Sequence, residues 1–418
     1  MIPFPLTLYN ILQVPALTGY LLWSALSPRR RSALPGRLGL ERPEVEPGGL
    51  WIHALSLGEV ISARPLLTEL KRIRPDLPLY LSAATDTGLS AARREVREGR
   101  AQAAFRAPWD FFPAVSGLLD RLKPQGLIIV ETDIWPNLLL ACRKREVPSA
   151  LVNFRIPPAR DRGHKRFRRF FASTYGLLRA AAFPTETDRE RWEVLQVRGV
   201  ETRVTGSLKY DQPPPVPALG RDLGLDPGRP AVVAGSTHPG EEEMVLTAWA
   251  ELRADIPDLA LILAPRNMER MEEVAALIKS RGIDPARLSR GQGLDRGPVL
   301  LVDVLGRLAS LYALGRAAFV GGSLVPRGGH NVLEPAALGV PVCFGPHMEN
   351  FTAEARRLTG SGGGREIGGA EGLARFWRSL ILDPESAGAA AKAAQKVFFD
   401  HRGASARIVG LLGEAFGW

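Results

Sequence analysis

Two carboxylates and a lysine follow apolar segments of this chain, in positions where their side chains can take part in chemistry. Glu59 ends the motif HALSLGE, Glu131 begins ETDIWPN and Lys209 lies within GSLKYD. A partly desolvated carboxylate at the first turn of a helix can take a proton from an attacking hydroxyl group. Two acids near one centre suit transfer through an oxocarbenium-like state, and a lysine can stabilise a leaving phosphate. These residue types indicate a group-transfer reaction.

Each of these residues also has an ordinary structural explanation. Glu59 can simply complement the dipole of its helix, and its position alone does not decide between the two interpretations. Thr132 or Asp133 is expected to cap the next helix, which leaves Glu131 as the second carboxylate of a cleft. Lys209 can be a solvated surface residue, although lysine is rare in a chain that mostly uses arginine.

Residues 321–346, GGSLVPRGGHNVLEPAALGVPVCFGP, predict a site for a sugar nucleotide. One glycine pair ends an apolar run, and a second pair opens a helix-like segment expected to start near His330 and Asn331. The N–H groups at a helix start favour an anion, and glycine lets a ligand approach the backbone closely. Glu334, one turn further, suits a ribose diol.

Two more motifs place polar side chains after predicted strands. Ser236 and Thr237, in GSTHPGEE, can cap the next helix and also face a phosphate. Arg266, in APRNMER, can pair with a phosphate or a carboxylate through two parallel hydrogen bonds. A solvated surface arginine is the alternative for Arg266.

The composition is that of a globular protein with an anionic partner. The 418 residues suffice for two domains, and 45% hydrophobic with 23% charged residues is an ordinary balance. Cys142 and Cys343 lie far apart in apolar surroundings, as reduced core residues do. A net charge of +10 suits nucleic acid, acidic lipid or a phosphorylated substrate.

The N-terminal segment favours a membrane anchor. Residues 2–28 carry no charge, and the cluster 29–31 is Arg-Arg-Arg. A signal peptide would have its positive charge before the apolar stretch. The length just spans a bilayer, but Pro15, Asn10 and Gln13 make a poor spanning helix. We expect an anchor in or through the membrane with the arginines on the cytoplasmic side; a buried helix is the alternative.

Beyond this segment, strand-like and helix-like patterns alternate. Such alternation predicts parallel sheets covered on both faces, with ligands at the carboxyl ends of the strands. A proline-rich connector at 210–217 separates two series, and the tract Gly360–Gly364 is expected to be a loop. Helices are expected at Val60–Arg72 and Pro113–Leu122. The strands are expected at Leu50–Leu55, Leu79–Ala83, Gly126–Val130, Ala150–Phe154, Ala180–Phe183, Ala231–Ala234, Leu259–Leu263, Val299–Val302, Ala317–Val320 and Pro341–Phe344.

In chain order, HALSLGE, ETDIWPN, GSLKYD, GSTHPGEE, APRNMER and GGSLVPRGGHNVLEPAALGVPVCFGPH resemble the bacterial 3-deoxy-D-manno-octulosonic acid (Kdo) transferases, a lipid A glycosyltransferase family. The resemblance extends from about Ile2 to Phe351, and more loosely to the C-terminus. The GGHN and EP elements alone would indicate only the GT-B glycosyltransferase class. SLGE, ETDIWPN and GSLKYD together are much more specific.

The resemblance implies a GT-B fold, an α/β architecture of two Rossmann-like domains with a cleft between them. We expect a membrane anchor at 1–31, an acceptor-binding domain at 32–209, a linker at 210–217 and a CMP-Kdo-binding domain at 218–418. The C-terminal helix of the last domain can return to the first.

The resemblance also assigns roles to individual residues. Glu59 would be the general base, and Glu131 with Lys209 would stabilise the transition state. In many relatives an acidic residue follows the glycine of the Leu305–Arg307 segment, so Arg307 departs from the family pattern. The predicted CMP-Kdo site comprises Ser236, Thr237, Pro265, Arg266, Leu305, Gly306, Arg307, Gly329, His330, Asn331, Val332, Leu333 and Glu334.

The implied reaction is an inverting, metal-independent transfer of Kdo from CMP-Kdo to a lipid A precursor, without a cofactor. The implied partners are these two substrates and an anionic membrane surface at the cytoplasmic face of the inner membrane, with no nucleic acid. Residues 155–171 mix arginines and aromatic side chains, as interfacial or solvated basic helices do. The alternatives are a GT-B enzyme that uses a UDP-sugar and a lipid acceptor, and a basic membrane-associated protein without catalysis.

Overall fold

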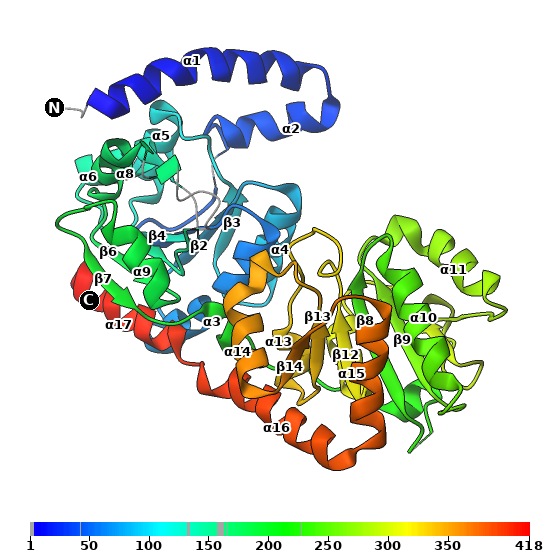
Figure 1. The fold of residues 1–418 in the computed structure, drawn as a ribbon. Coiled ribbons are helices and arrows are strands. Elements are labelled where there is room, and N and C mark those ends of the chain that lie inside the picture. Colours follow the sequence, from blue (N-terminus) through cyan, green and yellow to red (C-terminus); the bar gives the residue numbers. More distant parts are fainter. Residues whose placement is uncertain (1–3, 42, 132–133, 157–162, 165, 227) are drawn as a thin grey trace. The chain divides into compact units, whose positions relative to one another are not determined.

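The computed structural model describes residues 4–41, 43–131, 134–156, 163–164, 166–226 and 228–418. Two compact units divide the chain (Figure 1). Unit 1 comprises Met1–Gln212 and Arg402–Trp418, and unit 2 comprises Pro213–His401. The chain therefore leaves unit 1 once and returns to it for its last helix.

Unit 1 is built on a seven-stranded sheet in the order β3-β2-β1-β4-β5-β6-β7. All neighbouring strands are parallel. Parallel strands buried on both faces are continuous apolar runs, which is why most of them are recognisable in the sequence. The strands are β1 (Leu50–His53), β2 (Leu79–Ala83), β3 (Ala103–Arg106), β4 (Gly126–Val130), β5 (Ser149–Val152), β6 (Ala180–Phe183) and β7 (Glu201–Val204).

Helices pack on both faces of this sheet. One apolar cluster joins it to α3 (Leu57–Ile73), α4 (Asp86–Arg97) and the C-terminal α17 (Ala404–Phe416). A second cluster joins the other face to four further helices. These are α5 (Phe112–Leu122), α6 (Pro136–Lys144), α8 (Arg168–Tyr175) and α9 (Glu186–Glu193). The described part of the predicted basic segment 155–171 enters α8; residues 157–162 and 165 lie outside the described residues.

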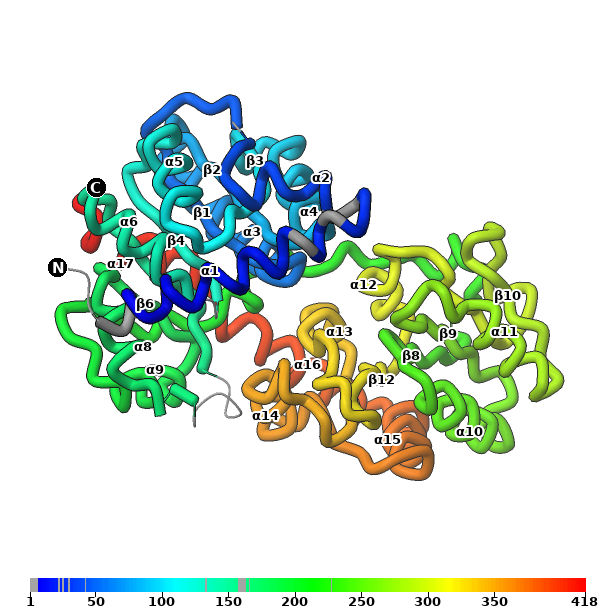
Figure 2. The backbone as a smooth tube through the Cα atoms, turned by 90° about the horizontal axis from the view of Figure 1, so that it is seen from above, coloured from blue at the N-terminus to red at the C-terminus, as the bar shows by residue number. Residues whose placement is uncertain are grey.

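The N-terminal segment forms α1 (Phe4–Ala25), followed by α2 (Pro28–Arg37). Figure 2 shows α1 running across unit 1 from α8 towards α2. Its polar side chains face the unit: the Tyr9 hydroxyl donates to Asp110 Oδ2 at 2.9 Å, and Gln13 Nε2 donates to the Asp110 carbonyl at 2.8 Å. Within the described part of the chain, no helix is both long and apolar enough to cross a membrane.

Unit 2 repeats the architecture with the strand order β10-β11-β9-β8-β12-β13-β14, again all parallel. Its strands are β8 (Ala231–Thr237), β9 (Ala260–Pro265), β10 (Ala286–Arg287), β11 (Val299–Leu301), β12 (Ala317–Val320), β13 (Val342–Phe344) and β14 (Gly364–Glu366). Its α-helices are α10 (Glu241–Arg253), α11 (Met271–Ser280), α12 (Leu308–Leu311), α13 (Leu333–Ala337), α14 (Thr352–Ser361), α15 (Ala370–Leu382) and α16 (Pro384–Asp400).

Every strand expected from the sequence is present, as are the two expected helices, as α3 and α5. Four short strands at the sheet edges were not predicted: β7, β10 and β14 lack an apolar run, and the apolar run of β3 is only three residues long. The expectation that Gly360–Gly364 is only a loop is wrong. Helix α14 continues to Ser361 and β14 begins at Gly364, with Gly362 at φ 81° ending the helix.

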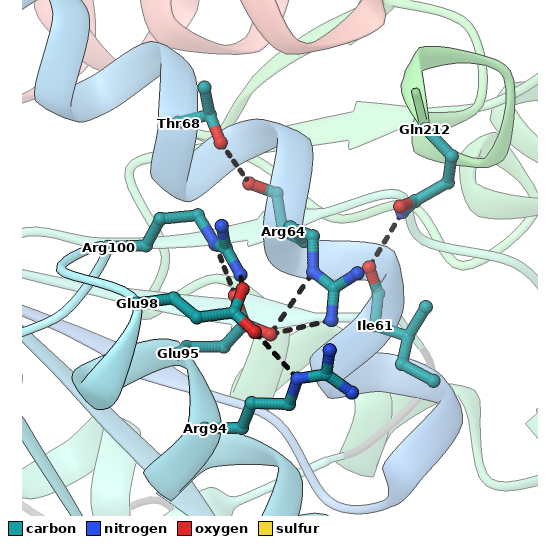
Figure 3. A network of polar contacts seen from close by, with 8 residues as sticks. All are labelled: Ile61, Arg64, Thr68, Arg94, Glu95, Glu98, Arg100 and Gln212. Atoms are coloured by element: carbon teal, nitrogen blue, oxygen red, sulfur yellow. Dashed lines mark hydrogen bonds and ion pairs between the residues drawn. The ribbon is translucent and has the colours of Figure 1, made fainter. Parts of the chain in front are cut away.

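An ion network ties α3 to α4 in unit 1 (Figure 3). The buried Glu95 carboxylate accepts from Arg64 at 3.1 and 2.7 Å and also pairs with Arg100. Gln212, the last residue of unit 1 before the chain enters unit 2, donates from Nε2 to the carbonyl of Ile61 on α3. These contacts hold α3 in place against its neighbours.

Candidate active site

The sheet of unit 1 has a topological switch point between β1 and β4. The chain progresses from β1 through β2 to β3 in one direction, and from β4 to β7 in the other. Loops that diverge in this way leave a crevice at the carboxyl ends of the two central strands, where α/β proteins bind ligands. Glu59 follows β1 and Glu131 follows β4 directly, so both predicted acids flank the switch point.

The Glu59 side chain is held by the backbone at the start of α3. Its Oε2 atom accepts from Ser56 N at 2.9 Å and from Leu55 N, in a capping box with Ser56 at the N-cap. The side chain is only 8% exposed. The predicted position on the first turn is confirmed. Glu59 therefore also caps α3, and the same hydrogen bonds fix the orientation of its carboxylate.

Glu131 and Lys209 lie at the same edge of the sheet and are linked through a residue that sequence reasoning missed. Asn153, directly after β5, donates from Nδ2 to Glu131 Oε1 at 3.4 Å. Its Oδ1 accepts from Leu208 N at 3.2 Å, next to Lys209 in the 3₁₀ turn η1 (Leu208–Asp211). The expected strand ran through Phe154 and therefore concealed Asn153 inside it.

Helix α6, which begins at Pro136 within ETDIWPN, is capped by Asp110, a residue outside this motif. Thr132 and Asp133, the predicted caps, lie outside the described residues, and the N-cap position of α6 is Trp135. The Asp110 carboxylate accepts from the backbone N–H groups of Asn137 and Leu138 at 2.9 and 2.8 Å. Burial raises the pKa of Asp110 to about 6. No local sequence signal connects Asp110 with this helix start.

In unit 2 the switch point lies between β8 and β12. Ser236, at a bulge near the end of β8, has φ 58°, in the left-handed region. Thr237 is buried, and its hydroxyl donates to Glu242 Oε1 at 3.0 Å. The N-cap of α10 is Gly240, so the expectation that Ser236 or Thr237 caps this helix is wrong. The bulge keeps both residues in the strand, too early to reach the helix start.

At this switch point, four backbone N–H groups converge on the Glu241 carboxylate. Its carboxylate accepts from His238 N at 2.9 Å and from the loop after β12, at Gly322 N, Ser323 N and Leu324 N, at 2.7, 3.0 and 2.9 Å. A loop of this kind would bind an anion. Here the protein supplies the anion itself, and Glu241 ties the two central strand ends together.

Two histidines meet at the same edge. His238 Nε2 lies 2.9 Å from His330 Nε2, and the rings are stacked with centroids 5.2 Å apart. Burial, followed by the charge of Arg266 and the neighbouring His238, lowers the pKa of His330 to about 4. Burial lowers the pKa of His238 as well. At neutral pH the pair is uncharged, with one ring donating to the other.

The helix near the second glycine pair begins later than predicted. Helix α13 starts at Leu333, because Asn331 Oδ1 accepts from Leu333 N at 3.1 Å and holds the preceding residues in a turn. Asn331 Nδ2 donates to Glu334 Oε1 at 3.1 Å. Burial raises the pKa of Glu334, while the contact with Asn331 and the charge of Arg266 act in the opposite direction.

The remaining predicted donor-site residues differ in what they can offer a ligand. Val332 and Leu333 are buried in the core, so only their backbone can reach a ligand. Gly329 has φ 71°, and a Cβ atom there would lie 2.3 Å from Met348 Sδ. Pro265 ends β9. The exposed residues Leu305, Gly306 and Arg307 precede α12.

The described residues contain no group of three or more His, Cys, Asp or Glu side chains that could hold a metal ion. The two cysteines are free and buried, as expected.

Solved structures with low sequence identity share this fold. A glycosyltransferase from Rickettsia africae matches with a TM-score of 0.60 at 10% identity, covering 89% of this chain and 99% of its own. A UDP-GlcNAc 2-epimerase from Neisseria meningitidis matches with a TM-score of 0.60 at 14% identity, covering 88% and 100%. The two parallel-sheet α/β units therefore have the fold of the GT-B glycosyltransferases.

Sequence comparison then gives the family. Residues 32–212 match the model of the 3-deoxy-D-manno-octulosonic-acid transferases. The 3-deoxy-D-manno-octulosonic acid transferase of Bordetella pertussis is 34% identical, and that of Haemophilus influenzae is 32% identical; each match covers 94% of this chain and 93% of the relative. The chain belongs to the Kdo transferase family, and it is a glycosyltransferase.

The crystal structure of the C-terminal CMP-Kdo binding domain of WaaA from Acinetobacter baumannii is 33% identical and covers 43% of the chain. Its TM-score of 0.41 is too low to bear on the fold.

Proposed function

We propose that this enzyme transfers Kdo from CMP-Kdo to a hydroxyl group of a lipid A precursor, with inversion at the anomeric carbon and without a metal ion. Kdo transfer in lipopolysaccharide biosynthesis follows from membership of the family. The observation that carries the proposed site is the position of Glu59 and Glu131 on the two sides of the switch point of unit 1.

In the proposed step, the acceptor hydroxyl oxygen attacks the anomeric carbon while the bond from that carbon to the phosphate oxygen of CMP breaks. Glu59 takes the hydroxyl proton, since its carboxylate is fixed at the helix start. Glu131 stabilises the positive charge that develops on the sugar ring, and Lys209 stabilises the negative charge on the phosphate of the leaving CMP. In unit 2, Arg266 provides a positive charge for the phosphate, and the neutral His238–His330 pair provides the one ring N–H that is not used between the two rings.

The proposed donor site also includes Ser236, the backbone from Gly329 to Glu334 and the segment Leu305–Arg307. Gly329 has a left-handed backbone and no side chain, and in this proposal the ligand contacts its backbone. Arg307 is exposed and departs from the family pattern, so in this proposal the segment contributes through its backbone.

The proposed location is the cytoplasmic face of the inner membrane, with α1 lying in the interface. Tyr9 and Gln13 bind unit 1, whereas Leu8, Ile11 and Leu12 are exposed at 48, 62 and 62%. A helix with one polar side bound to protein and one apolar side open suits a membrane surface better than a bilayer-spanning position.

The test is a transfer assay with CMP-Kdo and a tetra-acylated lipid A precursor, with and without a chelator. We expect transfer that survives chelation. CMP should raise the melting temperature more than UDP, because only a bound nucleotide stabilises the folded state. Transfer from a UDP-sugar, or a loss of activity restored by one divalent ion, would contradict the proposal.

A further inference from the structure

Two neighbouring strands of unit 1 end in residues with an unusual backbone conformation. Val130 of β4 and Val152 of β5 are partners in the sheet, and the next residues, Glu131 and Asn153, have φ angles of 72° and 55°. Residues other than glycine rarely adopt positive φ, and such residues gather at functional sites where the surrounding structure holds them. Both strained positions follow the strands directly, at the sheet edge that carries the predicted acids.

The hydrogen bonds of Asn153 define the orientation of its amide. Its oxygen Oδ1 accepts from the backbone N–H of Leu208 at 3.2 Å, so its Nδ2 group points to the opposite side. From there Nδ2 donates to Glu131 Oε1 at 3.4 Å and to Ser62 Oγ at 3.3 Å. Asn153 is 0% exposed.

These contacts join three elements that each carry a predicted catalytic residue. Ser62 lies on α3, whose first turn bears Glu59. Leu208 begins η1, the turn that bears Lys209. Since a buried amide can accept on one side and donate on the other, it can serve a backbone N–H and a carboxylate at once. Aspartate cannot donate, and glycine keeps the left-handed backbone but offers no side chain.

We propose that Asn153 is a positioning residue of the transfer site, which holds the Glu131 carboxylate and the η1 turn with Lys209 in a fixed arrangement. This inference rests on the proposed function, because it assigns Glu131 and Lys209 to the reaction. Asn153 touches no substrate in this role. It acts through Glu131.

The test is a double-mutant cycle on kcat at saturating CMP-Kdo and acceptor, with Asn153→Gly and Glu131→Gln. Asn153→Gly keeps the backbone conformation and deletes the amide, and we expect a loss of about 30-fold in kcat, in the range of a displaced catalytic group. In the Glu131→Gln background the same change should cost about threefold or less, because residues that act together are not additive. Equal losses in both backgrounds would show a purely structural role and overturn the proposal.

A second variant covers the case in which Asn153→Gly does not fold. Asn153→Asp keeps the acceptor for Leu208 N and places a second carboxylate beside Glu131. Since like charges this close disfavour joint ionisation, the acid limb of the pH–kcat profile should move up by about one pH unit. An unshifted profile contradicts the proposal. The control Ser62→Ala removes only the third contact and should change kcat by about threefold at most.

Crystal structures separate this inference from the proposed function. In Asn153→Gly, the Glu131 carboxylate and the η1 turn should be displaced from their wild-type positions, whether or not the enzyme uses CMP-Kdo. An unchanged Glu131 side chain would refute the positioning role. Absence of transfer by the wild-type chain would instead refute the proposed function.

Discussion

At the scale of single residues, two buried carboxylates of this enzyme have structural duties, and one of them, Glu59, is also the proposed base. Glu59 caps α3 and Glu241 fills a group of backbone N–H donors in unit 2. The two differ in their surroundings: Glu241 is fully buried and makes four backbone contacts, whereas Glu59 retains 8% exposure at a switch point. A carboxylate that serves as a base needs such access to solvent or substrate.

Replacing Glu59 by Gln should separate the two duties. The amide oxygen can still accept from Ser56 N, so the helix cap should weaken by only about 1 kcal/mol. Loss of the base should lower kcat by about 10²- to 10⁴-fold. The measurements are transfer rate, melting temperature and CMP affinity. Near-normal turnover would remove Glu59 from the role of base, and loss of CMP affinity would point to a general folding defect.

A second prediction concerns His53, which is buried at the end of β1. Burial, followed by the charge of Arg37, lowers the pKa of His53 to about 3. The unfolded chain therefore binds a proton near pH 6.5 that the folded protein binds only near pH 3. Stability should fall as the pH drops through this window, by about 1.4 kcal/mol per pH unit for one proton. Asp110, with its pKa raised to about 6, acts in the opposite sense between pH 6 and 3.8.

The variant His53→Gln isolates this term, because Asp110 contributes equally to both proteins. Glutamine is neutral at every pH and retains a polar group for Ser82, which lies 2.8 Å from His53 Nδ1. We expect the difference in unfolding free energy between wild type and variant to change with pH between 6 and 4. Urea denaturation at a series of pH values measures it. A difference that stays constant over this range would mean that His53 titrates normally.

At the scale of helices and strands, α3 matters most because its first turn carries Glu59 and because it contacts Asn153 through Ser62. The buried Glu95 connects it to α4 through Arg64 (Figure 3). The arginine partners keep side-chain exposures of 27 and 23%, so water can relieve part of their charge when Glu95 is lost. The network therefore stabilises by less than a fully buried one would.

Glu95→Gln should lower the free energy of unfolding by about 1 to 3 kcal/mol, because it leaves two arginines without their shared carboxylate. The matched control is Glu98→Gln on the same side of the network. Glu98 is 35% exposed in its side chain, so water screens its ion pairs and its removal should destabilise the protein less than the removal of Glu95. Chemical denaturation measures both. Equal effects for the two variants would contradict the ranking by burial.

Comparison with the sequence shows which elements a pattern can predict. Central strands such as β4 (Gly126–Val130) are apolar throughout, since both faces are covered, and they are found with accurate positions. Edge strands such as β7 (Glu201–Val204) are polar and cannot be told from loops. Residues at the carboxyl ends of central strands, such as Ser236 within β8 and Glu131 after β4, are predictable as site candidates because ligands bind at this edge of a parallel sheet.

What the sequence could not reveal are contacts between residues far apart in the chain. Asp110 at the start of α6 and His238 beside His330 become neighbours only through the fold. Asn153 was hidden because an asparagine at a strand end looks like a strand residue until its φ angle is known. Local patterns therefore predict the positions of site residues, but not their hydrogen-bond partners.

At the scale of the whole molecule, each unit has a parallel sheet between layers of helices, and the last helix of the chain, α17, packs on unit 1. Asp211, at the exit from unit 1, accepts from Gly403 N and Ser405 N at 2.6 Å each and so caps the returning α17. Helix α17 then packs Ile408 and Leu412 into the core. The last residues are thus part of the unit that carries Glu59.

The exposed apolar side of α1 gives the whole molecule a surface that suits a membrane, and the net charge of +10 suits an anionic one. A triple variant, Leu8, Ile11 and Leu12 to Ser, removes apolar side chains that are 48 to 62% exposed and leaves Tyr9 and Gln13 bound to unit 1. The loss of about 3 kcal/mol of apolar burial should weaken binding to vesicles by roughly 100-fold.

Sedimentation with vesicles of phosphatidylglycerol and phosphatidylcholine measures this binding. Transfer to a detergent-dispersed acceptor should remain near the wild-type rate, because the three side chains are not part of the proposed site. The control Leu382→Ser removes a side chain of similar exposure, 60%, at the end of α15 in unit 2, and it should leave vesicle binding unchanged. Added salt should weaken the binding of the wild-type protein, since screening reduces its attraction to anionic lipid. If the triple variant binds vesicles as tightly as the wild type, then α1 is not the membrane-binding element, and the anionic surface is recognised elsewhere on the molecule.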